Sequence, residues 1–373
     1  MAGGVNVVDK SMHRITAIDW MRGIVMILMA LDHASGFFND GRIFADSILL
    51  YESGAILATD QFLTRWVTHL SAPTFVFLSG TAIAISAFYR HEQGLSQTQI
   101  DRDLLIRGAF IAMLDLVLLS FFAGKMIIQV LYAIGISMML MVLLRRLGCR
   151  TLLISAFILL LGGEALTMWL LAPNGDVPFW LALTFAPTFG ESPTVLYPLI
   201  PWLAMMMLGW VLGEWIMTQR QNMALISRQL LIGGSCALLC FVLIRYFDGY
   251  GNMFMTLEGN TFVQWLHVSK YPPSLAYTTL ELGIMAIILS LLIRLEPIFG
   301  VRKNGPVLVF GQTALFFYLA HFAVLGALSL VINRGGLEQA YLVAILTLII
   351  LYPICRIYRM LKWRYPQSLL RFI

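Results

Sequence analysis

Four ionisable residues interrupt one long apolar stretch of this chain, between residues 14 and 35. They are Asp19, Arg22, Asp32 and His33. If the stretch crosses a membrane, each of these groups costs about 3 kcal/mol and must be paired, hydrated or functional. A guanidinium can bind a phosphate through two hydrogen bonds, and an imidazole can take a proton from a nucleophile or carry an acyl group. The stretch is therefore the first place to look for chemistry.

Five residues of this stretch share one face of a helix, because they follow spacings of 3, 4, 3 and 4: Asp19, Arg22, Met26, Met29 and His33. At a rise of 1.5 Å per residue, His33 lies about 16 Å beyond Arg22 along the axis. The face therefore presents a cation near one end and an imidazole near the other. Asp32 points about 100° away from His33, so these neighbours do not form a ready-made catalytic pair.

Each of these groups has two interpretations. Asp19 and Arg22 are three residues apart and could form an ion pair that fixes the helix in a bundle. Arg22 could instead contact an anionic group that arrives from the cytoplasm. His33 is either a hydrogen-bonded packing residue or a proton-handling group, since an ionisable group at membrane depth is a functional candidate by default.

Three further histidines and a lysine add to the candidates. His69 is expected at the same membrane level as His33, either solvated or functional, and His321 lies in the middle of another apolar stretch. His267 and Lys270 precede a double proline that fits the start of a helix. All four are candidates for proton handling or substrate contact.

The composition identifies the elements that must position these residues. Of the 373 residues, 59% are hydrophobic and 12% are charged, and the mean hydropathy is +0.82. This excludes a water-soluble enzyme, because soluble chains are typically about 25% charged. The net charge of +5 is explained by the excess of Lys and Arg in cytoplasmic loops, so no nucleic-acid partner is expected. The four cysteines lack metal-ligand spacing, and no metal is predicted.

Ten apolar segments are long enough to span a bilayer, which needs roughly 20 residues per crossing. The sequence therefore predicts an all-α, polytopic membrane helix bundle of about ten transmembrane helices, as one domain over residues 1–373. Lys and Arg alternate between successive loops, with 18 on one side and six on the other. This bias predicts cytoplasmic termini, with tails at 1–14 and 362–373. The expected spans are 15–38, 67–89, 104–122, 127–144, 152–171, 195–217, 230–246, 274–293, 306–331 and 340–361.

Three longer segments are expected on the face opposite the termini: 39–66, 172–194 and 247–273. Two pieces within them, residues 48–57 and 178–185, are apolar but too short to span, so they are expected to be interfacial or re-entrant. The larger loops would therefore gather on one side of the bundle.

Five motifs occur in an order that resembles the heparan-α-glucosaminide N-acetyltransferase-like family of transmembrane acyltransferases, which includes bacterial members. They are IDWMRGIVMILMALDH (18–33), APTFVFLSG (72–80), YPLIPWLAMMMLG (197–209), SKYPPSLAY (269–277) and LFFYLAHF (315–322). The resemblance implies transfer of an acetyl group from cytoplasmic acetyl-CoA, a co-substrate, to an amino sugar or other glycan on the extracytoplasmic side. It also implies the bacterial inner membrane and is compatible with a homodimer.

The resemblance further implies an active histidine in the first non-cytoplasmic loop. Residues 34–68 of this chain contain no histidine, so His33 and His69 stand on either side of the expected position. His33 is the first choice for the general base or for an acetylated intermediate. Asp32 or His321 would orient it or relay its proton.

The remaining candidate residues fall into two groups. Phosphates of acetyl-CoA would meet cationic residues near the cytoplasmic face, namely Arg22 with its neighbour Asp19, and Arg102, Arg107 or Arg302. The acceptor would approach the outer loops, at His267, Lys270 and Tyr271.

Two other function classes are compatible with ionisable groups at membrane depth. A secondary transporter or exporter of a sugar or lipid-linked anion also needs intramembrane Asp, Arg and His, although no inverted repeat is detected. A structural membrane protein without turnover does not explain so many ionisable groups. Release of free CoA from acetyl-CoA would distinguish the enzyme from the transporter.

Overall fold

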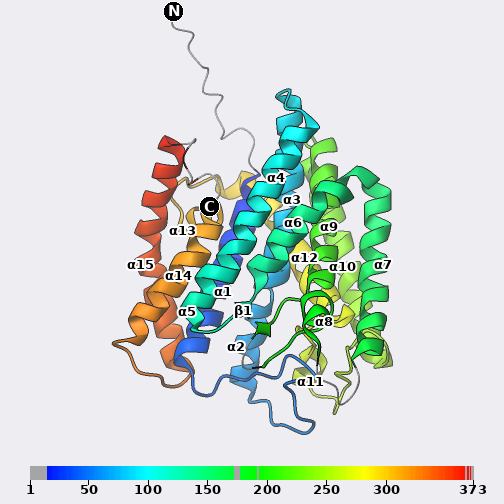
Figure 1. Cartoon of the computed structure of the whole chain (residues 1–373), viewed down its shortest axis with the longest axis vertical. Helices are drawn as coiled ribbons and strands as arrows, with labels where there is room; N and C mark the ends of the chain where they lie inside the picture. Colours follow the sequence, from blue (N-terminus) through cyan, green and yellow to red (C-terminus); the bar gives the residue numbers. More distant parts are fainter. Residues whose placement is uncertain (1–14, 172–176, 191–192, 366–367, 369, 371–373) are drawn as a thin grey trace, which may run out of the picture.

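The computed structural model is a bundle of long helices packed side by side (Figure 1). It describes residues 15–171, 177–190, 193–365, 368 and 370. The expected tail at 1–14 lies outside the described residues.

Within this part of the chain, nine segments are long and apolar enough to cross a membrane, and one bent pair of helices makes up to ten. The predicted all-α bundle of about ten spans is confirmed. The nine segments are α1 (Thr16–Phe38), α2 with α3 (Thr59–His69 and Ser71–Glu92), α4 with a π-helical turn and α5 (Gln97–Met113, Leu114–Leu119 and Ser120–Ala123), α6 with a 3-10 turn (Val130–Leu144 and Arg145–Leu147), α7 (Cys149–Leu170), α9 (Leu199–Thr218), α10 (Met223–Phe247), α12 (Leu275–Phe299) and α15 (Leu337–Arg364).

The span predicted at 306–331 is broken into two helices. α13 (Pro306–Gln312) and α14 (Ala314–Ser329) meet at an angle of 101°. A glycine at the end of α13 lets its backbone lie directly on α1: a Cβ on Gly311 would lie 1.7 Å from the carbonyl oxygen of Asp19. α14 therefore begins beside the N-terminal half of the polar face that the sequence predicts on α1.

Small residues let α3 and α9 pack backbone to backbone. A Cβ on Gly80 would lie 2.1 Å from the carbonyl oxygen of Met206, and one on Gly209 would lie 1.9 Å from that of Phe77. Membrane helices associate through such close contacts, because lipid supplies no hydrophobic force between them. α3 is therefore held against α9, and it also packs against α1.

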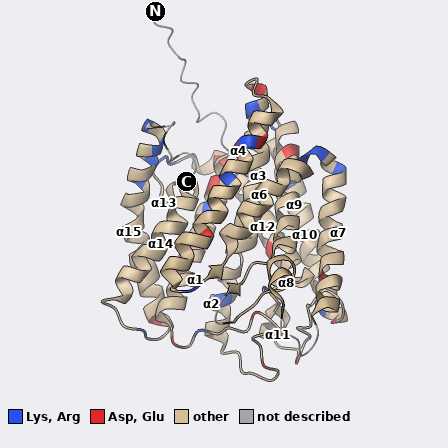
Figure 2. Ribbon diagram, viewed as in Figure 1, with Lys and Arg blue, Asp and Glu red and all other residues tan. Residues whose placement is uncertain are grey.

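The two ends of the bundle differ in charge and structure. Lys and Arg gather at the end where α1 begins and α15 ends (Figure 2). The longer connections lie at the opposite end, with α8 (Phe179–Thr184), α11 (Phe262–Leu266) and the two-residue parallel strands β1 (Ile127–Ile128) and β2 (Thr194–Val195). Of the two apolar pieces expected there, 178–185 contains α8 and 48–57 forms turns without a helix.

Two buried side chains hold the outer connections in place. The guanidinium of Arg245 donates to the carbonyl oxygens of Met255 and Gln264 and to Oδ1 of Asn252, at 2.9, 2.6 and 2.8 Å. The carboxyl group of Glu164 accepts backbone hydrogen bonds from the same loop and from the first residue of α12. The segment between α10 and α12 is therefore anchored to the bundle.

The close approach of α1 and α13 predicts a stability effect. We expect Gly311→Val to lower the free energy of unfolding by about 1–3 kcal/mol, because the new side chain cannot enter the contact without moving one backbone. Gly326→Ala on α14 is the control, since a Cβ there meets nothing within 4 Å. Thermal unfolding in detergent micelles measures both, and equal melting temperatures would contradict the described contact.

Candidate functional site

Three cavities follow one another along α1, and we name them the inner cleft, the central chamber and the outer chamber. Their volumes are about 500, 40 and 310 Å³. Asp19 and Arg22 line the inner cleft, at the end where α1 begins. Met26 and Met29 line the central chamber, and His33 lines both chambers. The polar face predicted on α1 therefore points at protein-lined cavities.

Neighbouring cavities share walls. Phe75 of α3 lines both the inner cleft and the central chamber. Asp32, His33, Gln129 and Tyr197 line both the central and the outer chamber. Gln129 and Tyr197 reach this boundary because each closely follows one of the paired strands β1 and β2. His33 therefore stands at the junction between the narrow chamber and the wider one.

The structure brings the predicted residues His33 and His321 together. Nδ1 of His33 lies 2.6 Å from Nε2 of His321, and Nδ1 of His321 lies 3.2 Å from the carbonyl oxygen of Phe317. A carbonyl only accepts, so Nδ1 of a neutral His321 carries its proton, and its Nε2 accepts from Nδ1 of His33. This assignment leaves the lone pair on Nε2 of His33, which makes no hydrogen bond with the described residues, as the basic nitrogen.

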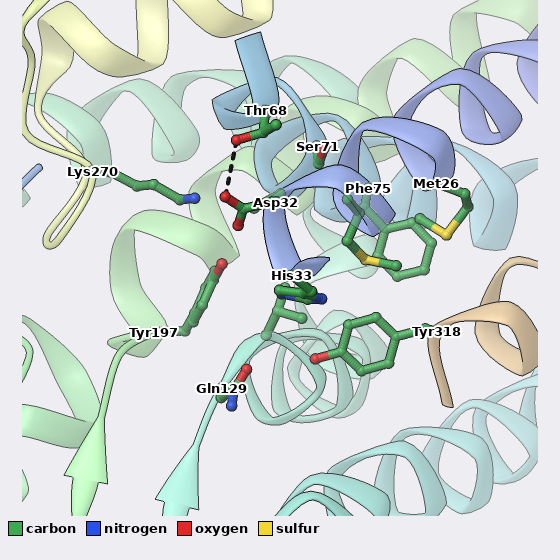
Figure 3. A pocket seen from close by; sticks show the side chains of 13 residues that line it. Met26, Asp32, His33, Thr68, Ser71, Phe75, Gln129, Tyr197, Lys270 and Tyr318 are labelled. Carbon is green, nitrogen blue, oxygen red and sulfur yellow. Dashed lines mark hydrogen bonds between the residues drawn. The ribbon is translucent and has the colours of Figure 1, made fainter. Parts of the chain in front are cut away.

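The central chamber is lined by polar groups of several helices. Tyr318 lies beside His33 and Lys270 extends toward Asp32, while Thr68 and Gln129 also line the chamber (Figure 3). The hydroxyl of Tyr318 is buried without a hydrogen-bond partner among the described residues. The chamber therefore holds donors that the protein itself does not satisfy.

Of the two residues that the sequence offered for orienting His33, Asp32 bonds other side chains. Its Oδ1 accepts hydrogen bonds from Arg42, Arg65 and Thr68 at 3.0, 2.5 and 3.0 Å. No hydrogen bond between Asp32 and His33 occurs in the described part of the chain. Asp32 therefore anchors two arginines, and the residue that orients His33 is His321.

His69 belongs to the same charged network through a second carboxylate. Oδ2 of Asp46 lies 2.5 Å from Arg65 and 3.1 Å from Nε2 of His69. Burial by itself raises the pKa of Asp46, but the guanidinium of Arg65 and the hydrogen bond from His69 outweigh it and hold that pKa well below its usual range. His69 contacts this network and not His33, so the structure gives it a supporting position.

The three residues predicted to bind the acceptor substrate lie around Asp46. Nε2 of His267 donates to the carbonyl oxygen of Ala45 at 2.5 Å, and burial lowers the pKa of His267. The backbone N–H groups of Lys270 and Tyr271 donate to the carbonyl oxygen of Asp46 at 2.9 and 3.1 Å. Tyr271 lines the outer chamber, whereas Lys270 reaches the central one. His267 holds the loop and lines neither.

The inner cleft collects cationic side chains. Arg22 donates to the carbonyl oxygen of Leu78 at 2.9 Å and lies 3.4 Å from Asp19, as the predicted ion pair requires. Arg107 also lines this cleft, and its Nε is buried without a partner in the described structure. Two of the predicted phosphate-binding residues, Arg102 and Arg302, are exposed and are not among the residues that line the cleft.

The sequence missed several residues of the site. Arg65 was outside the predicted span at 67–89, because the polar start of α2, TDQFLTR, lowers the local hydropathy. Asp46 and Arg42 lie in a loop without a recognisable motif. Arg90 and Lys362 line the inner cleft but look like ordinary cytoplasmic loop cations. Arg65 lies within one helical turn of the predicted span at 67–89, and this position is the signal by which the sequence could have identified it as a site residue.

Comparison with known families gives a match over more than half of the chain. The family described as heparan-alpha-glucosaminide N-acetyltransferase, catalytic, matches residues 14–245. The predicted family resemblance is confirmed. The matched segment includes His33, Arg65 and Arg107, whereas Lys270 and His321 lie beyond it. A comparison with curated proteins finds no match.

The network around Arg65 predicts a large stability effect. We expect Arg65→Leu to lower the free energy of unfolding by about 3–5 kcal/mol, because it removes the cation shared by Asp32 and Asp46. Arg220→Leu breaks the exposed pair with Glu92 and should cost less than about 1 kcal/mol. Thermal unfolding in micelles distinguishes them, and similar melting temperatures would show that the network does not stabilise the fold.

Proposed function

The chain belongs to the heparan-alpha-glucosaminide N-acetyltransferase family, and we propose that it carries the acetyl group of cytoplasmic acetyl-CoA to an amino sugar or other glycan acceptor on the opposite side of the membrane. Membership in this family makes the chain a membrane acetyltransferase. The donor, the acceptor and the direction are our proposal, as is its place in a bacterial inner membrane with both termini in the cytoplasm.

The position of His33 carries this proposal. Its free Nε2 stands where the central and outer chambers meet, and its ring is held by the hydrogen bond between Nδ1 and His321. A base whose second nitrogen is fixed by a neighbour is the usual arrangement for activating a nucleophile. A nucleophile in the outer chamber and an acyl group in the central chamber would both lie beside His33.

The inner cleft is suited to the nucleotide end of acetyl-CoA. Arg22, Arg90 and Arg107 line it together, and guanidinium groups bind phosphates in bidentate geometry. Arg22 and His33 are separated by about 16 Å along α1, a length comparable to an extended pantetheine arm. The thioester would then reach the central chamber while the phosphates remain in the inner cleft.

The reaction exchanges one bond for another at the carbonyl carbon. The acceptor nitrogen or oxygen attacks the thioester, its bond to carbon forms, and Nε2 of His33 takes its proton. The carbon–sulfur bond then breaks, and the proton passes from His33 to the departing sulfur to give CoA. His321 is a positioning residue, because it holds the ring of His33 and does not touch the reacting atoms.

The outer chamber is suited to one sugar unit. Its volume is about 310 Å³, and it is lined by Tyr197, Tyr271 and Phe189 together with the charged residues around Asp46. Aromatic faces with a few polar groups are the usual lining of a small-molecule site. An amine or a hydroxyl of the acceptor would face His33.

Removing the base tests the proposal directly. We expect His33→Ala to lower CoA release at least about 100-fold, because general-base catalysis contributes that much, while acetyl-CoA still stabilises the protein against heat. Proteoliposomes supplied with acetyl-CoA and either glucosamine or glucose, as amine and hydroxyl probes, provide the assay. His91→Ala, an exposed histidine, is the control. Undiminished turnover in His33→Ala would remove His33 from the mechanism, and acceptor uptake without CoA release in wild type would favour the transporter.

The inner cleft gives a separate prediction. We expect Arg107→Met to raise KM for acetyl-CoA about 10-fold or more, because a hydrogen bond to a charged group is worth about 1.5–3 kcal/mol, with little change in kcat. Arg102→Met removes an exposed arginine of the same helix and serves as the matched control. Equal KM values for the two variants would place the phosphates elsewhere.

A further inference from the structure

Lys270 is a buried cation without a counter-charge at bonding distance. Lys270 is 3% exposed, and its ammonium group makes no hydrogen bond or ion pair with the residues that the structure describes. Its side chain contacts the ring of Tyr271, with Nζ 5.1 Å from the ring centroid. Lys270 lines the central chamber, where its side chain extends toward Asp32 without reaching bonding distance (Figure 3).

The carboxylates near Lys270 are engaged by other residues. Asp32 pairs with Arg42 and Arg65, and Asp46 pairs with Arg65 and His69. Glu281, a buried acid on α12, forms no ion pair with Lys270 in the described part of the chain. The cluster of Arg42, Arg65 and Lys270 therefore has one more positive charge than its two aspartates supply. Burying a charge away from water costs several kcal/mol unless an opposite charge or hydrogen-bond partner compensates for the lost hydration.

The size of the central chamber decides which partner fits. At about 40 Å³ it has room for about three water molecules, which is also the scale of an acetyl group. A sugar with its own carboxylate fits the outer chamber but not this one. An oxyanion on an acetyl group is a negative charge small enough to form in this space.

We propose that the Lys270 ammonium stabilises the oxyanion that forms on the acetyl carbonyl during transfer. This rests on the proposed function. When the nucleophile attacks, the carbonyl π electrons move to oxygen, and the new anion accepts a hydrogen bond from Nζ of Lys270. When the carbon–sulfur bond breaks, the electrons return and the carbonyl reforms, with no net change at Lys270.

The position of the cation explains why it is unpaired in the resting protein. A donor that already bonded a carboxylate would have to break that bond during the reaction. A fixed donor aimed at the place where charge develops needs no such reorganisation, and loss of one such donor typically lowers kcat about 10²–10³-fold. The hydrogen bonds from the backbone of Lys270 and Tyr271 to Asp46 fix the backbone from which the lysine side chain extends.

The test measures kcat and KM for acetyl-CoA and glucosamine in proteoliposomes. We expect Lys270→Met to lower kcat about 100-fold with both KM values within about threefold of wild type. We also expect its melting temperature to equal or exceed that of wild type, because the change removes an unpaired buried charge. A purely structural lysine would lower the melting temperature instead.

Two variants serve as controls. Lys125→Met removes an exposed ammonium group from the same face of the bundle and should retain wild-type kinetics. Lys270→Cys treated with 2-bromoethylamine regains an ammonium group at nearly the native length, and at least a tenfold recovery of kcat is expected. Wild type treated in parallel accounts for its exposed cysteines, Cys149, Cys236 and Cys240.

Several outcomes would overturn the inference. An unchanged kcat in Lys270→Met would do so, as would a rise confined to KM for glucosamine, which would make Lys270 an anchor for the acceptor. Loss of kcat in Tyr318→Phe but not in Lys270→Met would assign the oxyanion to the phenol. Absence of CoA release by wild type with both glucosamine and glucose would reject the proposed function, a result distinct from failure of Lys270 alone.

Discussion

One guanidinium shared by two carboxylates holds the outer half of this protein together. Arg65 on α2 lies 2.5 Å from Asp32 on α1 and 2.5 Å from Asp46 in the loop that joins them. None of these charges could stay buried alone, because each would lose its hydration without compensation. The pairing therefore fixes three segments at once. Asp32 and His33 leave α1 in different directions, and His33 makes its hydrogen bond with His321 on α14.

The broad architecture was predictable because membrane burial imposes a strong pattern on sequence. Every predicted span has a helical counterpart, and the face of α1 that carries Arg22 and His33 was placed correctly by 3.6-residue periodicity. The break between α13 and α14 was not predictable, since hydropathy is continuous across Thr313. At this break Gly311 lies directly against the backbone of α1.

The site was predictable only in part, for a related reason. Hydropathy identifies ionisable groups inside spans, and it identified His33, Asp32 and His321. It does not show which loop folds back onto them, so the contacts of Asp46 with Arg65 and of Lys270 with the central chamber appear only in three dimensions. The family match ends at residue 245, yet the loop with Lys270 and Tyr271 and the helix α14, which follow it, complete the walls around His33. A site assembled from both halves of a chain leaves no contiguous motif.

The narrowness of the central chamber has a consequence for the cell that contains this protein. A channel wide enough for a sugar to cross would also let ions through and dissipate the electrochemical gradient of an energy-transducing membrane. The space of about 40 Å³ between the two larger cavities has room for about three water molecules. In the proposed reaction only the acetyl group would pass this constriction, so neither the acceptor nor CoA would have to cross the membrane.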